Sequence, residues 1–160
     1  MSKGAESGGM TCLMILDPGP DGFTVPGITE IIPLMPEGTC AASSRLLANR
    51  YPELGYQEGI LVMRVGGELR ASVRHAWNVG PSGEVIDTTN RPVTFGPGQE
   101  VTYSYIPDGP EHDAERRAVA TKIGEPTPFD DDPTAQDQGD QLAVGWLEQA
   151  TARDVDTDSP

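Results

Sequence analysis

The chain has 160 residues, of which 36% are hydrophobic and only 6% aromatic, and 25 acidic against 11 basic residues give a formal net charge of −14. This length suits one compact domain with a lean, mainly aliphatic core. The charge excludes functions that depend on binding phosphate backbones or anionic membrane surfaces, since both require clustered lysine and arginine. We therefore predict neither a nucleic-acid partner nor a membrane partner.

The N-terminal region does not have the pattern of a secretory signal. Lys3 is the only early basic residue, and the apolar run from Cys12 to Leu16 is too short. No stretch approaches the roughly 20 apolar residues of a membrane span. Two cysteines, Cys12 and Cys40, do not make a disulfide framework. We therefore expect a cytoplasmic protein whose thiols are reduced.

The first predicted helix begins at a cysteine. The sequence Pro36-Glu37-Gly38-Thr39 breaks any preceding element and offers Thr39 as an N-cap. Residues 40–50 then have helix-forming composition, and Pro52 ends the run. The pattern therefore predicts a helix with Cys40 in its first turn.

Four strands are predicted after this helix. Apolar and β-branched residues alternate with turn sequences such as Gly66-Gly67 and Gly80-Pro81-Ser82-Gly83, and such short connections predict antiparallel pairing. The predicted strands cover Tyr56–Val65, Ser72–Val79, Glu84–Asp87 and Val101–Ile106.

The remaining segments complete the predicted organisation. A charged helix is predicted at Glu111–Ile123, and the acidic, Pro-rich stretch after it indicates a linker. The domain is predicted to span 11–124, between a disordered N-terminus at 1–10 and a series of C-terminal segments: a linker at 125–140, a short helix at 141–152 and a disordered acidic tail at 153–160. Helices packed against one antiparallel sheet define the α+β class.

Three residues have the types that thiol catalysis requires. A helix N-terminus and a nearby imidazolium both favour the thiolate form of cysteine, and Cys40 is placed for the first effect. His75 on a following strand supplies the second if that strand lies against the helix. An acidic group then orients the imidazole, and Asp87 follows the turn at 80–83 on the adjacent strand.

The ordered motifs resemble those of the transglutaminase-like superfamily, which has a papain-like fold. His75-Ala76-Trp77-Asn78-Val79, then Gly83, then Val85-Ile86-Asp87-Thr88-Thr89 is similar to the family pattern HAW-x-V…G-x-hydrophobic-hydrophobic-D-P-T. Gly38-Thr39-Cys40 resembles the start of the family's cysteine helix, and Tyr56-Gln57-Glu58-Gly59 resembles the strand between the two motifs. The resemblance covers roughly residues 36–90. Thr88 stands where the family usually has proline.

The resemblance implies a Cys-bearing helix packed on a small antiparallel sheet, with a catalytic triad. Cys40 attacks an amide carbonyl to form a thioester, His75 transfers the proton and Asp87 orients His75. Trp77 and Asn78 flank the histidine as packing or substrate-binding residues. The substrate is then a protein or peptide amide, and no cofactor or metal is implied. No side chain before Cys40 is an evident oxyanion donor.

Several alternatives stay open. The thioester is resolved by water in a peptidase or deamidase and by an amine in a transglutaminase, and the sequence does not distinguish these outcomes. An inactive domain that binds a basic partner through its acidic surface is the rival from another class. His112 next to Asp113 lacks the paired spacing of a zinc site and predicts a solvated histidine. The oligomeric state is not predicted.

Overall fold

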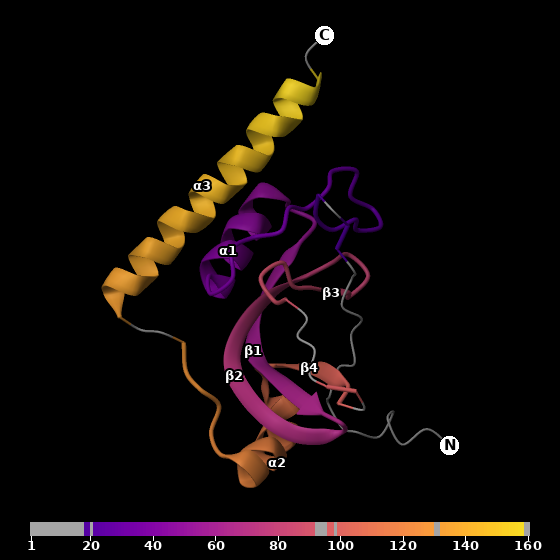
Figure 1. The fold of residues 1–160 in the computed structure, drawn as a ribbon, viewed down its shortest axis with the longest axis vertical. Coiled ribbons are helices and arrows are strands. Elements are labelled where there is room, and N and C mark those ends of the chain that lie inside the picture. The colour runs from indigo at the N-terminus through magenta and orange to yellow at the C-terminus, as the bar shows by residue number, and fades with distance from the viewer. Residues whose placement is uncertain (1–17, 20, 92–95, 98, 130–131, 159–160) are drawn as a thin grey trace. The chain divides into compact units, whose positions relative to one another are not determined.

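The computed structural model describes residues 18–19, 21–91, 96–97, 99–129 and 132–158, with the backbone alone described at 151–158. The segment 1–10, predicted to be disordered, and Cys12 lie outside these residues. Figure 1 shows the elements in chain order. They are α1 (Cys40–Arg50), β1 (Gly55–Val65), β2 (Glu68–Val79), β3 (Val85–Ile86), β4 (Val101–Pro107), the 3₁₀ turn η2 (Pro110–His112), α2 (Asp113–Ile123) and α3 (Pro133–Asp158).

The strands form one antiparallel sheet in the order β3-β2-β1-β4. Gly66 and Gly67 link β1 to β2 with φ of 59° and 86°, values that glycine adopts without steric strain in a tight hairpin turn. β4 pairs with β1 from Val65↔Val101 to Gly59↔Pro107. A mixture of helices with a small antiparallel sheet confirms the α+β prediction. Among the described residues, no helix is both long and apolar enough to cross a membrane.

The chain divides into two compact units. We call the part formed by Gln57–Ala76 and Arg91–Phe129 the strand unit. The helix unit consists of 18–56, Trp77–Asn90 and 132–158 among the described residues. β2 is shared, because its last three residues belong to the helix unit.

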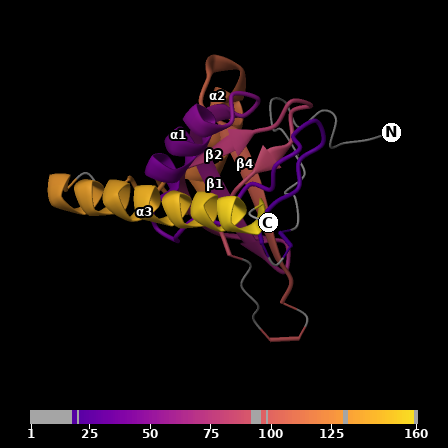
Figure 2. The ribbon, with the colours of Figure 1, turned by 90° about the horizontal axis from the view of Figure 1, so that it is seen from above.

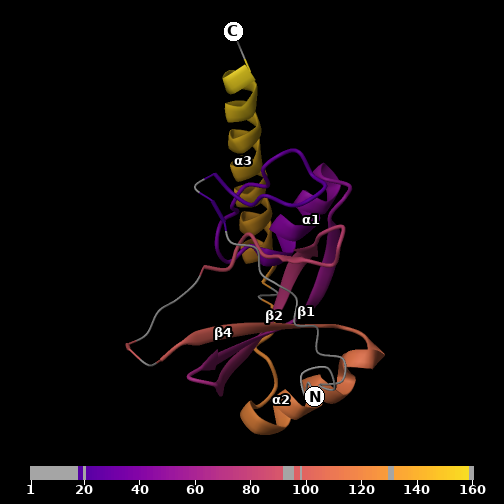
Figure 3. The same cartoon turned by 90° about the vertical axis from the view of Figure 1, so that its right-hand side faces the viewer.

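The strand unit is held together by a small apolar cluster under α2. Ile60, Val62 and Ile106 of the sheet are buried with Val119 of α2, and Leu69 and Ile123 pack at the edge of this cluster. Figure 3 shows α2 beside β4. The predicted helix at Glu111–Ile123 is therefore present, although its first turn is the 3₁₀ turn η2.

The helix unit has the larger core. Apolar residues of the loop before α1 pack on α1, α3 and β3, and the buried members are Phe23, Val25, Ile28, Ile32, Met35, Leu47, Tyr51, Leu54, Ile86, Ala143 and Leu147. α3 packs along α1, as Figures 1 and 2 show. Ala143 and Leu147 are four residues apart and thus lie on one face of α3. These two residues carry the α3 contribution to the core.

α3 is longer than the sequence predicted. It starts at Pro133 rather than 141 and runs to Asp158, so 133–140 is helical instead of linker and 153–158 is helical instead of disordered tail. The Asp132 carboxylate accepts the N–H of Thr134 at 2.9 Å, and Pro133 occupies the first helical position, where its missing N–H is harmless. This start signal lies inside an acidic, Pro-rich run, a composition that predicts a linker.

Candidate functional site

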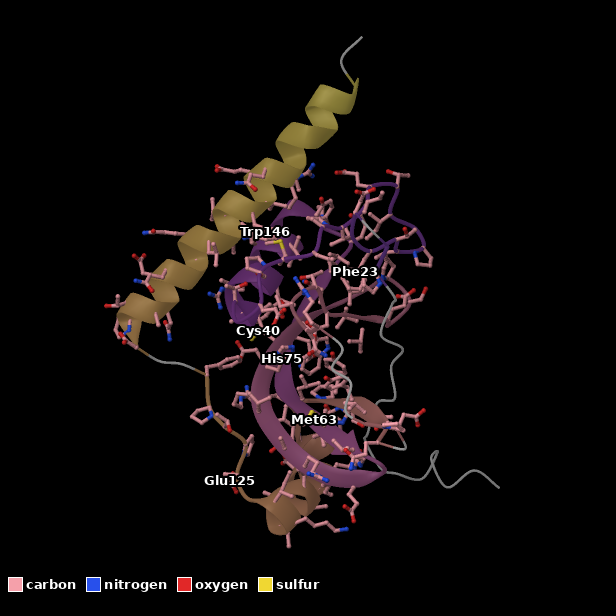
Figure 4. The ribbon with its side chains drawn as sticks, viewed as in Figure 1. Phe23, Cys40, Met63, His75, Glu125 and Trp146 are labelled. Atoms are coloured by element: carbon pink, nitrogen blue, oxygen red, sulfur yellow. The ribbon has the colours of Figure 1, made fainter. Side chains whose placement is uncertain are left out.

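Cys40 is the first residue of α1, where Figure 4 labels it, and its free thiol is partly exposed. Thr39 precedes it at the N-cap position but makes no side-chain capping bond. Its hydroxyl instead donates to the Pro36 carbonyl at 2.7 Å and lies 2.6 Å from the Ser43 hydroxyl. Thr39 therefore lies at the predicted N-cap position, but its side chain does not cap the first N–H groups of α1.

Asp87 follows β3 and is only 2% exposed. Three donors converge on its Oδ1 atom, each at 3.2 Å: the N–H and hydroxyl of Thr89 and the N–H of Asn90. A buried carboxylate is strongly destabilised unless hydrogen bonds compensate the loss of water. The N–H groups and the hydroxyl of the turn that follows Asp87 therefore compensate the burial of its Oδ1 atom.

His75 lies on β2 in the strand unit, as labelled in Figure 4, and is 8% exposed. Its ring lies 6.1 Å from the Tyr105 ring, centroid to centroid, with a tilt of 52° between the planes. Cys40 and Asp87 belong to the helix unit, so the predicted triad draws on both units. β2 passes from the strand unit, which holds His75, into the helix unit at Trp77.

Trp77 and Asn78 have no exposed surface at all. The Asn78 amide donates to the carbonyls of Ser44 at 2.9 Å and Gly55 at 3.1 Å, which joins the end of β2 to α1 and to the start of β1. Both side chains contact protein rather than solvent, so we treat them as packing residues. The substrate contact predicted for them stays a prediction.

An arginine network in the strand unit was not predicted from the sequence. Arg74 donates to both oxygens of Asp108 at 2.7 and 2.8 Å, and Arg116 donates to the same carboxylate at 2.8 Å and to Asp113. The Arg74 hydrogen bond is the main reason that the pKa of Asp108 lies below its ordinary value. Arg74 and Asp108 are 34 residues apart, and no local pattern indicates this pairing.

A pocket of about 320 Å³ lies at this network. Residues of β1, β2, α2 and the segment after α2 surround it: Ile60, Arg74, Asp113, Arg116, Arg117, Val119, Ala120, Glu125 and Pro126. Arg74 and Arg116 are already bonded to carboxylates. The pocket is therefore best interpreted as the edge of a structural ion-pair network.

His112 is buried rather than solvated, with 9% exposure, which contradicts the sequence prediction. It lies in η2, and neighbouring Glu115 carries a carboxyl whose pKa is raised by burial. Within the part of the chain that the structure describes, no three His, Cys, Asp or Glu side chains gather as a metal ion would require.

Comparisons with known proteins returned no match from family models, curated proteins or solved structures.

Proposed function

We propose that the protein is a thiol enzyme of transglutaminase-like, papain-like fold that acts on an amide through Cys40, His75 and Asp87. The Cys40 thiolate attacks the amide carbonyl carbon, and the resulting C–N cleavage leaves an acyl thioester on the sulfur. The His75 imidazolium gives its proton to the departing amine. Water or a second amine then displaces the thiol, which makes the enzyme a hydrolase or an acyltransferase.

The observation that carries the proposal is the buried, oriented carboxylate of Asp87 at the end of β3. Asn78 pairs with Ile86 in the antiparallel register of β2 and β3. Continuing that register by one residue sets Asp87 opposite Trp77. Alternation along β2 puts Trp77 and His75 on the same side of the strand. His75 precedes Trp77 by two residues on β2, and the proposed Asp87–His75 pair follows the order of the resembled motif.

The start of α1 also favours this chemistry. Backbone N–H groups at a helix N-terminus stabilise a thiolate and the oxyanion of a tetrahedral intermediate. Thr39 leaves these groups uncapped by its side chain, and the first turn contains no acidic residue that would oppose a thiolate. The backbone N–H of Cys40 is accordingly our oxyanion donor.

The test is the pH dependence of iodoacetamide labelling at Cys40 in a Cys12→Ser background. We expect the labelling rate to reach half its maximum at or below about pH 7, because the thiolate is stabilised. His75→Ala should slow labelling near neutral pH without unfolding the chain. Asp87→Asn should do the same, because its amide no longer favours the productive imidazole tautomer.

Asp21→Asn supplies the control, since Asp21 is an exposed aspartate of the helix unit. Labelling that rises only above about pH 8 in the parent chain would indicate an ordinary thiol and rule out the enzyme. If Cys40 in Asp87→Asn is labelled at the parent rate, Asp87 does not orient His75.

A second candidate is a binding module that keeps the fold without turnover and engages a basic partner. The net charge of −14 favours it. An ordinary thiol at Cys40, together with salt-sensitive binding of a lysine-rich peptide, would select this candidate.

A further inference from the structure

One side of β2, the side that faces away from β1, has few backbone partners in the strand unit. β3 pairs with β2 only at Asn78 and Val79, which belong to the helix unit. Along Glu68–Ala76, Val73 is the one residue that pairs on this side with another described residue, through a parallel bridge to Thr127. An edge of this kind is a template for the backbone of another extended chain.

The bridge comes from Glu125–Phe129, the short segment that follows α2. The Thr127 N–H donates to the Ser72 carbonyl at 3.0 Å, and the Thr127 carbonyl accepts the N–H of Arg74 at 2.7 Å. The guanidinium carbon of Arg74 lies 5.5 Å from the centroid of the Phe129 ring, a cation–π contact. The segment therefore shows what this edge accepts: one residue paired through its backbone and an aromatic ring two positions later.

Two prolines in the segment keep its outer side from pairing further. Thr127 turns both of its backbone groups toward β2, so Pro126 and Pro128 turn theirs away from β2. Proline has no N–H, and these positions therefore offer no donor to another strand. The segment covers the edge of β2 without creating a new edge that pairs in the same way.

The pocket beside the segment adds a preference for negative charge. Glu125 and Pro126 line it together with Arg116 and Arg117 of α2. Arg116 is paired with carboxylates. Arg117 is exposed and forms no ion pair with any residue that the structure describes. A carboxylate at the position of Glu125 thus shares a pocket with an arginine whose charge is not yet neutralised.

We propose that this side of β2 is a docking site for an extended peptide and that Glu125–Phe129 occupies it in cis. The ligand has the chemistry of the segment: an acidic residue, a residue two positions later that pairs with β2, and an aromatic ring two positions after that. A ligand without prolines that runs along more of Glu68–Ala76 forms more backbone hydrogen bonds than the segment does, which lets it compete with an occupant from the same chain. The site lies wholly within the strand unit and does not involve Cys40.

The experiment measures binding of a fluorescein-labelled peptide to the full chain by fluorescence anisotropy. The peptide has the sequence of residues 123–129 with both prolines replaced by threonine. Thr127→Pro in the protein removes the N–H that bonds to Ser72 and releases the segment, so the peptide should bind this variant at least about tenfold more tightly than the parent. Thr127→Ala changes the same exposed residue but keeps both backbone bonds, so its affinity should match that of the parent.

Further variants test the backbone pairing and the charge. A peptide that is N-methylated at the threonine in the position of Thr127 lacks the pairing N–H and should not bind. Arg117→Gln should weaken binding about two- to fivefold. Lys122→Gln removes an exposed charge of α2 outside the pocket and should leave the affinity unchanged. If Thr127→Pro does not fold, Phe129→Ala, which removes only the ring contact, replaces it with a smaller expected gain.

Each outcome decides a stated point. Tighter binding to Thr127→Pro that N-methylation abolishes supports the docking site. Equal binding to the parent and to Thr127→Pro, or binding to neither, overturns it. Dimers of Thr127→Pro that the peptide does not dissociate overturn the peptide ligand and assign the edge to a second copy of the chain. An unchanged affinity in Arg117→Gln overturns the preference for an acidic ligand. None of these outcomes bears on the proposed function, because Cys40 labelling is not measured.

Discussion

At the scale of single residues, Asn78 and Asp87 are buried polar side chains on either side of the β2–β3 turn. Their hydrogen-bond partners lie at different distances along the chain. Oδ1 of Asp87 accepts from donors two and three residues away along the chain. Asn78 is bonded to carbonyls 34 and 23 residues away. The role proposed for Asp87 therefore rests on a short motif, whereas the anchoring role of Asn78 depends on the folded arrangement of α1 and β1.

Asn78→Ala should destabilise the fold by about 2–3 kcal/mol, because two buried carbonyls lose a donor and a cavity is left. Asn78→Asp keeps the shape of the side chain but places an acceptor against the same carbonyls. Its loss of folding stability should therefore be at least as large. Urea unfolding at neutral pH measures both.

Asn49→Ala removes an exposed asparagine of α1 and serves as the matched control. A free energy of unfolding for Asn78→Ala within about 0.5 kcal/mol of the control would contradict the anchoring role.

At the scale of secondary-structure elements, α3 contains two glycines, Gly139 and Gly145, that differ in their neighbours. A Cβ atom added at Gly139 would lie 3.8 Å from the Thr39 methyl group, already in van der Waals contact. A single β-carbon therefore fits there at an ordinary contact distance. A Cβ atom added at Gly145 would meet nothing within 4 Å. Substitutions at these two glycines therefore distinguish the effect of packing on stability from the effect of helix propensity within one helix.

Gly145→Leu should stabilise the chain by up to about 1 kcal/mol, because leucine is the better helix former. Gly139→Leu gains the same propensity but overpacks the contact with Thr39, so it should destabilise by about 1–3 kcal/mol relative to Gly145→Leu. Thermal and urea unfolding followed by far-UV circular dichroism measure both. Equal effects of the two substitutions would mean that α3 does not pack closely at Gly139.

Elements with a clear local sequence pattern were predictable from the sequence. Elements that depend on contacts with distant parts of the chain were not. Composition and breakers predicted 40–50 as a helix, and α1 spans Cys40–Arg50. Alternation predicted Val101–Ile106, and β4 spans Val101–Pro107. α3 was underestimated because polar residues at 133–140 show no apolar stripe, and its stabilising contacts with α1 are distant in sequence. The candidate residues came from ordered motifs, but their burial and donors required the structure.

At the scale of the whole molecule, 25 acidic residues must coexist with 11 basic ones. The strand unit concentrates opposite charges around Asp108, which accepts from both Arg74 and Arg116. Glu115 behaves in the opposite way, because burial raises the pKa of its carboxyl. The stability of the fold in acid therefore depends on two kinds of carboxyl group. The pKa of one kind is lowered, as for Asp108, and the pKa of the other is raised, as for Glu115.

Asp108 should stabilise the fold at neutral pH and lose this effect in acid. Hydrogen bonds from Arg74 hold its pKa below the ordinary value of 3.8, so its contribution is present above that value and disappears as the pH falls through the lower, folded-state pKa. The side chain is 40% exposed, so screening by water limits the effect to under about 1 kcal/mol. Asp108→Asn should therefore lower the free energy of unfolding modestly at pH 7, and the deficit should shrink toward about pH 2.5.

Urea unfolding of both chains at several pH values measures this deficit, with Asp21→Asn as the exposed control that should show little deficit at any pH. Added salt should reduce the Asp108→Asn deficit at pH 7, because exposed ion pairs are screened. A deficit that stays constant into acid and in high salt would show that the variant loses packing rather than charge. The arginine network would then act through the fit of its side chains, and the acid sensitivity of the fold would have to come from other carboxyls.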